Sequence, residues 1–373
     1  MGLATAYRQE VSEADPATTS ARSPATLDRL RYRAQHYSLT MSLAIPGRLW
    51  NLIVSPRRQR IDAALVSTLQ RRYEELLERD LGNVARGYYP RALLYQFPLF
   101  GYLRQIPEAL ADVPRFLWRR YLGRHDDLPN GVDRRRYPRY YLRTFHWQTD
   151  GWLSDRSARL YDASVEFLFG GTADVMRRMA IPPVVDAVRG RTRPRILDLA
   201  CGTGRFLLQL HHALPHAQLY GLDMSGPYLR HASRLLDGTE ASLIADNAEA
   251  IPLVARQFDV VTSVYLFHEL PADARRRVMR EAWRVLVAGG RFVVCDSAQL
   301  SDSAELGAVL HGFPVTYHEP YYKGYLRDDL AAVMTECGFE VEDSAPHLVS
   351  KVVVGRKPQP PRARRRAARR RTT

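Results

Sequence analysis

From residue 195 onward, the pattern of apolar and polar positions switches regularly between two periods. Short apolar runs, of the length of buried strands, alternate with longer stretches in which apolar side chains recur every three or four residues, as in amphipathic helices. The predicted strands are residues 196–199, 219–223, 242–245, 258–264, 291–295, 340–344 and 351–354. The predicted helices between them include residues 206–214, 227–236 and 272–286. Strands that alternate with helices predict an α/β fold with a mostly parallel, doubly wound sheet.

Two boundaries of this pattern add detail. The helix at 272–286 has Pro271 at its entry and Gly289-Gly290 after its end, which are start and stop signals. The last two strands are separated only by a turn-like segment that contains Pro346. We therefore expect these two strands to form a hairpin, which adds an antiparallel strand to the sheet.

Residues 28–130 have helical spacing throughout. Apolar side chains recur at steps of four and three at Ile61, Leu65, Leu69, Tyr73 and Leu76. Within residues 100–122, we expect Pro107 and Pro114 to punctuate short helices. The sequence predicts a helical accessory region packed on the α/β core. Because arginines stand beside Phe116, Trp118 and Tyr121, an interfacial amphipathic helix is the alternative.

The segment between these two regions begins with a linker at 129–138. An aromatic-rich stretch follows at 140–152, and two further helices are predicted at 155–169 and 172–179.

Composition excludes several classes of protein. The chain has 373 residues, of which 46% are hydrophobic, which is enough for one large domain and a substantial second element. Its three cysteines have no metal-ligand spacing, so we expect neither a disulfide framework nor a metal site. The most apolar run, residues 92–103, falls far short of the roughly 20 residues that a spanning helix needs. Residues 1–27 are polar, lack a signal-peptide pattern and predict disorder. We expect a cytoplasmic protein, at most peripheral at a membrane.

The net charge of +14 is placed unevenly. Nine lysines and arginines lie in the last eighteen residues, among Pro and Ala without apolar periodicity. Residues 358–373 therefore predict a basic disordered tail. Attraction of the tail to nucleic acid or to anionic lipid remains open.

The segment 195–206, RILDLACGTGRF, carries the chemistry. A strand that ends near Asp198 leads into a small-residue turn and then a helix, and Gly202 and Gly204 permit positive φ and close approach of a ligand to the backbone. A carboxylate at this place repels pyrophosphate but attracts a cation. S-adenosylmethionine carries an ammonium and a sulfonium group, so the turn indicates a methyl-donor site. A dinucleotide fingerprint would need its third glycine at Leu207.

Together with the acids that end the next two strands and the terminal hairpin, this turn resembles that of the class I S-adenosylmethionine-dependent methyltransferases. The resemblance covers about residues 144–357 and is greatest to the small-molecule branch that includes ubiquinone-biosynthesis (methyltransferase type 11) enzymes. It implies a seven-stranded, mostly parallel Rossmann-like sheet with a terminal antiparallel hairpin. The methyltransferase domain is expected at residues 140–357.

The resemblance also implies a set of S-adenosylmethionine contacts. The family's motif places the methionine ammonium at Asp198, the ribose hydroxyls at Asp223 and the adenine amino group at Asp246. The remaining cofactor contacts carried over are Tyr161, Ala200, Gly202, Gly204, Met224 and Asn247.

Two loops at the carboxyl edge of the sheet offer catalytic candidates. His268 and His318 can each serve as a general base, because imidazole titrates near neutral pH. The alternative for His268 is that it and Glu269 shape the cofactor pocket or cap the following helix. The alternative for His318 is that it packs, with the neighbouring tyrosines, under the lid. Tyr317, Tyr321 and Tyr322 are candidates for lining the acceptor pocket.

We expect methyl transfer to a small, hydrophobic acceptor by in-line displacement. The motifs of enzymes that methylate nucleic-acid amines, pyrimidine carbon 5 or protein arginines are missing. The alternatives are a non-catalytic interaction protein on the same fold, or an RNA-associated methyltransferase that uses the basic tail. Contact with a membrane or an anionic polymer would run through the Arg-rich helices and the tail.

Overall fold

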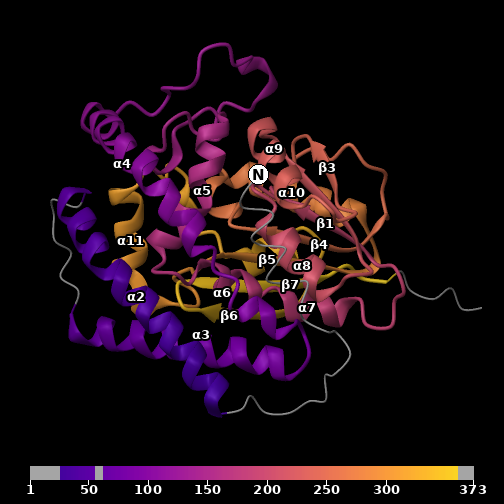
Figure 1. Cartoon of the computed structure of the whole chain (residues 1–373). Coiled ribbons are helices and arrows are strands. Elements are labelled where there is room, and N and C mark those ends of the chain that lie inside the picture. Colours follow the sequence, from indigo (N-terminus) through magenta and orange to yellow (C-terminus); the bar gives the residue numbers. More distant parts are fainter. Residues whose placement is uncertain (1–25, 55–61, 360–373) are drawn as a thin grey trace, which may run out of the picture.

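A seven-stranded sheet forms the centre of the molecule (Figure 1). The computed structural model describes residues 26–54 and 62–359, and for residues 44–54 the backbone alone. The strand order is β3-β2-β1-β4-β5-β7-β6. The strands are β1 (Arg195–Leu199), β2 (Gln218–Asp223), β3 (Ser242–Ala245), β4 (Phe258–Val264), β5 (Leu286–Ser297), β6 (Glu340–His347) and β7 (Ser350–Arg356). Strands β1 to β5 pair in parallel, and β7 runs antiparallel to both β5 and β6, which confirms the predicted sheet and its terminal hairpin.

Two predicted boundaries are wrong. Helix α10 (Ala272–Val285) leads directly into β5, so Gly289 and Gly290 lie inside that strand and do not terminate the helix. Pro346 lies within β6, paired with Lys351, and does not form the turn. A proline is tolerated there because β6 is an edge strand, where one row of backbone groups has no ladder partner.

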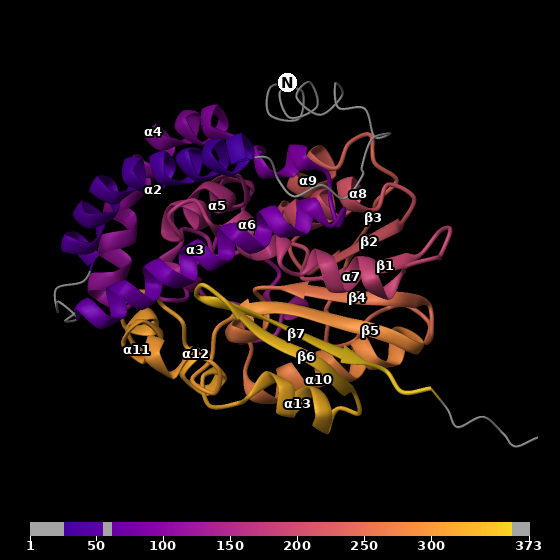
Figure 2. The same cartoon turned by 90° about the horizontal axis from the view of Figure 1, so that it is seen from below.

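Helices cover both faces of the sheet. Alternate side chains of β1 enter different clusters: Ile196 packs in one with α7 (Ile181–Ala187) and α8 (Arg205–Ala213), and Leu197 in the other with α10 and α13 (Leu330–Glu336). Figure 2 shows α7 on one side of the sheet, and α10 and α13 on the other. Helix α9 (Gly226–Leu235) joins the first layer, and the Ser225 side chain caps its N-terminus. Burial on both faces explains why the inner strands β1, β4 and β7 are largely apolar without alternation.

The N-terminal helices share the core of the sheet. Helices α2 (Thr26–Val54), α3 (Ala63–Ala85) and α4 (Leu99–Leu122) lie together at one end of the molecule (Figure 1). Leu76 and Leu81 of α3 pack in the same apolar cluster as Ile196. Asp80 of α3, fully buried, accepts hydrogen bonds from Arg178 at 2.9 and 2.5 Å. The N-terminal helices are therefore tied to the sheet by both apolar packing and a buried ion pair.

Helix α4 differs from the prediction of several short helices. It is one helix that includes Pro107 and Pro114. Both prolines lie on its exposed side, where the carbonyl groups that lose their hydrogen bonds can be solvated by water.

The remaining elements surround the carboxyl edge of the sheet. They are η1 (Arg91–Leu94), η2 (Arg134–Arg136), η3 (Phe145–Trp147), α5 (Asp155–Leu168), α6 (Ala173–Arg178), η4 (Phe267–Glu269), η5 (Ala304–Leu306), α11 (Gly307–Thr316) and α12 (Tyr322–Tyr325). Helices α5 and α6 match their predicted ranges. Among the helices of the described residues, none is long and apolar enough to cross a membrane. The predicted disordered ends, 1–27 and 358–373, lie almost wholly outside the described residues.

Candidate active site

A cleft opens at the carboxyl ends of β1, β2 and β4, with a volume of about 800 Å³ that includes its open mouth. Ligands of open α/β sheets bind at this edge. Its floor is the turn after β1 and the residues that follow β2 and β3, and its opposite wall is aromatic. The residues that line the cleft include Tyr140, Tyr141, Phe145, Trp152, Tyr161, Ala200, Gly202, Asp223, Met224, Tyr228, Asp246, Asn247 and Glu269.

The small-residue turn has the left-handed backbone that the glycines predicted. The φ angles are 55° at Ala200, 54° at Gly202 and 80° at Gly204. Gly204 lies behind the cleft wall, and a Cβ there would approach Ala232 Cβ of α9 to 3.0 Å. Gly204 thus lets α9 pack closely on the turn, while Ala200 and Gly202 present backbone to the cleft.

Asp223 is held rigidly at the floor of the cleft. One carboxylate oxygen accepts the Gly202 N–H at 2.9 Å, and the other accepts the Ser225 N–H at 2.7 Å. Burial raises the pKa of Asp223 to about 6. Each oxygen keeps a further lone pair, so the carboxylate can accept from two neighbouring hydroxyls at once.

Asp198 does not reach the cleft wall. It is 1% exposed, and its carboxylate accepts a hydrogen bond from the Thr262 hydroxyl at 2.7 Å. Burial raises the pKa of Asp198 to about 7. A buried carboxylate with one hydrogen bond is an electrostatic attractor for a cation above it.

Asp246 and Asn247 line the cleft beyond β3, beside Met224. The Asn247 N–H donates to Asp246 Oδ1 at 2.7 Å, so this N–H, expected to face adenine, is engaged by the aspartate. The Asp246 N–H donates to the Asp223 carbonyl, which fixes the two acids relative to each other.

The aromatic wall comes from the segment that precedes the sheet. Tyr161 of α5 makes edge-on ring contacts with Trp152 and with Tyr228 of α9. The Tyr228 hydroxyl lies 2.8 Å from the Ser157 hydroxyl, and Gln148 donates to it at 3.0 Å. These contacts place aromatic faces and edges over the glycine turn, where a sulfonium is favoured.

The comparisons with known proteins agree with this geometry. A family model described as "Methyltransferase domain" matches residues 196–290. A demethylmenaquinone methyltransferase of Thermotoga maritima is 30% identical over 181 residues, which are 48% of this chain and 75% of the relative. The chain belongs to the class I S-adenosylmethionine-dependent methyltransferases.

Two further relatives carry different names. A ubiquinone/menaquinone biosynthesis C-methyltransferase of Desulfotalea psychrophila is 31% identical, over 39% of this chain and 56% of the relative. A malonyl-[acyl-carrier protein] O-methyltransferase of Geobacter sulfurreducens is 32% identical, over 39% of this chain and 55% of the relative. The chain thus spans little more than half the length of these two relatives.

S-adenosylmethionine is the cofactor of this methyltransferase, and the cleft fits it. Backbone without an obstructing side chain lies at Gly202, a carboxylate with free lone pairs lies at Asp223, and buried negative charge lies below at Asp198. The individual contacts remain predictions.

The structure places the catalytic candidates of this methyltransferase outside the cleft wall. His268 is buried, with Nδ1 2.7 Å from Asp296 Oδ1. Burial disfavours the charged ring, but Asp296 outweighs it and raises the pKa of His268. His318 stacks on His125 at 5.1 Å, and burial, with His125 second, lowers its pKa to about 4.

The three predicted acceptor-binding tyrosines also lie behind the wall. Tyr322 is 2% exposed within the core, and its hydroxyl lies 2.6 Å from the Ser297 hydroxyl. Tyr321 meets the wall residue Tyr140 edge-on, and Tyr317 contacts the His146 ring. They support the wall and do not form it.

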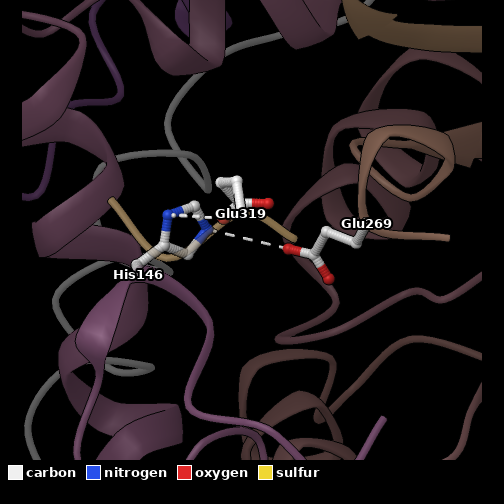
Figure 3. A group of neighbouring side chains, drawn as sticks. All are labelled: His146, Glu269 and Glu319. Atoms are coloured by element: carbon white, nitrogen blue, oxygen red, sulfur yellow. Dashed lines mark ion pairs between the residues drawn. The ribbon is translucent and has the colours of Figure 1, made fainter. Parts of the chain in front are cut away.

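Sequence reasoning gave Glu269 as an alternative pocket residue, and Glu269 does line the cleft. It did not connect Glu269 with His146 and Glu319, which lie beside it (Figure 3). His146 Nε2 is 3.7 Å from Glu269 Oε1, and His146 Nδ1 is 3.1 Å from Glu319 Oε1. Glu319 follows His146 by 173 positions in the sequence, with Glu269 between them, and no spacing rule connects the three residues.

Proposed function

We propose that this methyltransferase methylates a small, largely apolar acceptor with an oxygen-bearing ring, of quinol type. The observation that carries the proposal is the aromatic wall, formed by Phe145, Trp152 and Tyr161, directly over the cofactor cradle. Planar apolar rings gain dispersion and offset stacking against such a wall. The names of the relatives, two of which refer to menaquinone, support the same class of acceptor.

The protein contributes chiefly orientation. The bound cofactor supplies an electrophilic methyl group. Asp223 and the Gly202 backbone fix the donor end, while the aromatic wall confines the acceptor on the opposite side. Fixing both partners in line can lower the barrier by about 7–11 kcal/mol. The wall residues pack on one another, with Phe145 and Trp152 stacked at 6.0 Å, which holds the wall in place.

We further propose that the acceptor reaches the enzyme at an anionic membrane surface. The outer face of α4 exposes large apolar side chains, among them Phe100 (78%), Leu110 (64%), Trp118 (61%) and Tyr121 (83%). This is an apolar surface of the kind that marks interaction sites.

The charges around that face favour a bilayer over a protein partner. Arg104 and Arg115 are exposed beside the apolar side chains. The acids of α4 point inward: Glu108 pairs with Arg159 at 2.9 Å, and Asp112 pairs with Arg156 at 3.2 Å. An apolar face flanked only by cations is typical of helices that lie in the interface of an anionic bilayer.

Helix α4 is also joined to the cleft. Arg119 donates to the Trp147 carbonyl at 3.2 Å, and Trp147 belongs to the same turn as the wall residue Phe145. This bond ties the helix that carries the exposed apolar face to the segment that carries the aromatic wall.

A direct test offers the enzyme three acceptor classes and measures S-adenosylhomocysteine formation. We expect turnover with a short-chain quinol in anionic vesicles and none with a hydrophilic phenol or with RNA. Trp152→Ala should raise KM for the quinol at least tenfold, while changing the affinity for S-adenosylhomocysteine, which has no sulfonium, by much less. Turnover with RNA alone, or an unchanged KM in Trp152→Ala, would contradict the proposal.

A further inference from the structure

Three side chains with metal-ligating atoms meet at the back of the cleft. His146 lies in η3, Glu269 ends η4, and Glu319 precedes α12 (Figure 3). One ligand atom from each residue lies within 4.8 Å of the other two. The fold thus joins the segment before the sheet, the loop after β4 and the loop after β5 at one point.

The carboxylate of Glu319 has no hydrogen-bond partner among the described residues. Its side chain is fully buried, and neither oxygen is satisfied. His146 Nδ1 is likewise unsatisfied, although Glu319 Oε1 lies 3.1 Å away, because the pair lacks hydrogen-bond geometry. Orphaned buried carboxylates are rare, since burial without a partner costs several kcal/mol or shifts the group to its neutral form.

The backbone that carries His146 is also unusual. His146 has φ 54°, and Trp147 has φ 58°, so two consecutive residues other than glycine adopt the left-handed conformation. Such residues cost of order 1–3 kcal/mol each and cluster at ligand clamps and active sites. Arg119 holds the turn by donating to the Trp147 carbonyl and the Thr149 hydroxyl, and Thr149 in turn donates to Asp112 at 2.6 Å. The His146 ring lies beside the two glutamates (Figure 3).

We propose that His146, Glu269 and Glu319 bind a divalent transition-metal ion with mixed nitrogen and oxygen preference, such as Zn²⁺ or Mn²⁺. One imidazole nitrogen and two carboxylates match the ligand sets of such ions. The ion would neutralise the buried carboxylate of Glu319 and the half-buried one of Glu269, and it supplies the partner that Glu319 lacks. Binding needs the ligand atoms to close from their present spacing to about 2.0–2.2 Å from the ion.

The position of Glu269 indicates which way the free coordination positions of the bound ion would face. Glu269 lines the cleft, whereas Glu319 is sealed behind it, so the vacant positions face the acceptor. This role rests on the proposed function, whereas the metal site itself does not. An acceptor hydroxyl bound there would lose its proton to solvent at lower pH, and the resulting oxyanion, or the ring carbon that it activates, would attack the methyl carbon. The methyl–sulfur bond would break as the new bond forms, with its electron pair going to sulfur. Where a ring carbon is methylated, the hydrogen on that carbon would leave as a proton to solvent, which restores the aromatic ring.

The competing arrangement is a protonated Glu319, because burial raises the pKa of this carboxyl to about 8. The metal site and the protonated Glu319 differ in how the protein responds to added metal. The experiment titrates EDTA-treated full-length protein with Co²⁺, Zn²⁺, Mn²⁺ or Mg²⁺ alone. Readouts are bound metal per chain, the visible spectrum of Co²⁺ and the thermal midpoint.

We expect one equivalent of Zn²⁺ or Co²⁺ per chain, a rise in the thermal midpoint and at least a tenfold loss of affinity in Glu319→Gln. Glu269→Gln provides a second variant if Glu319→Gln does not fold. The matched controls are Glu240→Gln and His216→Gln, both exposed, which should bind as wild type. Absence of binding, or equal binding in all variants, would overturn the metal site. S-adenosylhomocysteine binding, measured in parallel, reports the cofactor site separately.

Discussion

Removal of the Asp223 carboxylate tests the cofactor site most sharply. Its oxygens are positioned by the Gly202 and Ser225 N–H groups, and each has a lone pair left for a ribose hydroxyl. Two charge-assisted hydrogen bonds at about 1.5–3 kcal/mol each give about 3–6 kcal/mol. At 1.4 kcal/mol per tenfold, Asp223→Ala should weaken S-adenosylhomocysteine binding by about 10²- to 10⁴-fold.

Isothermal calorimetry measures this loss, and the thermal midpoint shows whether the fold survives. Because burial raises the pKa of Asp223 to about 6, the ionised carboxylate is unfavourable to the unliganded fold at pH 7. Asp223→Asn should therefore keep a thermal midpoint close to that of the wild type while losing affinity. The exposed Asp343→Ala on β6 is the control. An affinity within threefold of wild type in folded Asp223→Ala would refute the ribose assignment.

Three other perturbations have defined outcomes. Burial raises the pKa of Asp198 to about 7, above its value in the unfolded chain, so ionisation of this carboxyl destabilises the unliganded fold as the pH rises toward 7. In urea melts, Asp198→Asn should be more stable than the wild type at pH 8, and the difference should vanish near pH 4. A stability difference that does not depend on pH would contradict this. The double variant Trp118→Asp, Leu110→Asp should no longer float with anionic vesicles but should still bind S-adenosylhomocysteine. Unchanged flotation would exclude the α4 face as the membrane-binding surface. Asp80→Ala leaves Arg178 buried without its partner and should cost about 3–5 kcal/mol in a denaturant melt; a loss below 1 kcal/mol would mean that the N-terminal helices are not held by this pair.

The sequence was sufficient for the sheet because its signals are local. Most strands are apolar runs bounded by turns, and Pro271 marks the start of the helix that follows β4. The edge strand β6 is the exception, because its residues are mostly polar and exposed. The predictions that were wrong also have local physical reasons. Pro346 signals a turn in most contexts, but an edge strand tolerates it. Likewise, exposure of Pro107 on α4 leaves no buried carbonyl unsatisfied, so the helix continues.

The cofactor floor was predictable for the same reason, whereas the rest of the site was not. Asp223 and Gly202 follow strands at fixed offsets, so their meeting follows from the topology. The positions of His268 and Tyr322 behind the wall depend on how α12 packs, and no fixed spacing in the sequence predicts that packing. The cluster at His146 depends on a left-handed turn at a residue other than glycine, for which the sequence carries no recognised signal.

The central claim is that this cleft transfers a methyl group to an apolar acceptor. The most direct measurement supplies methyl-labelled S-adenosylmethionine and a quinol-containing lipid extract, and counts the label in the organic phase. The account predicts label in the organic phase with the wild-type enzyme, and none with Asp223→Ala. Label that stays entirely in the aqueous phase, with an enzyme that binds S-adenosylhomocysteine normally, would contradict it.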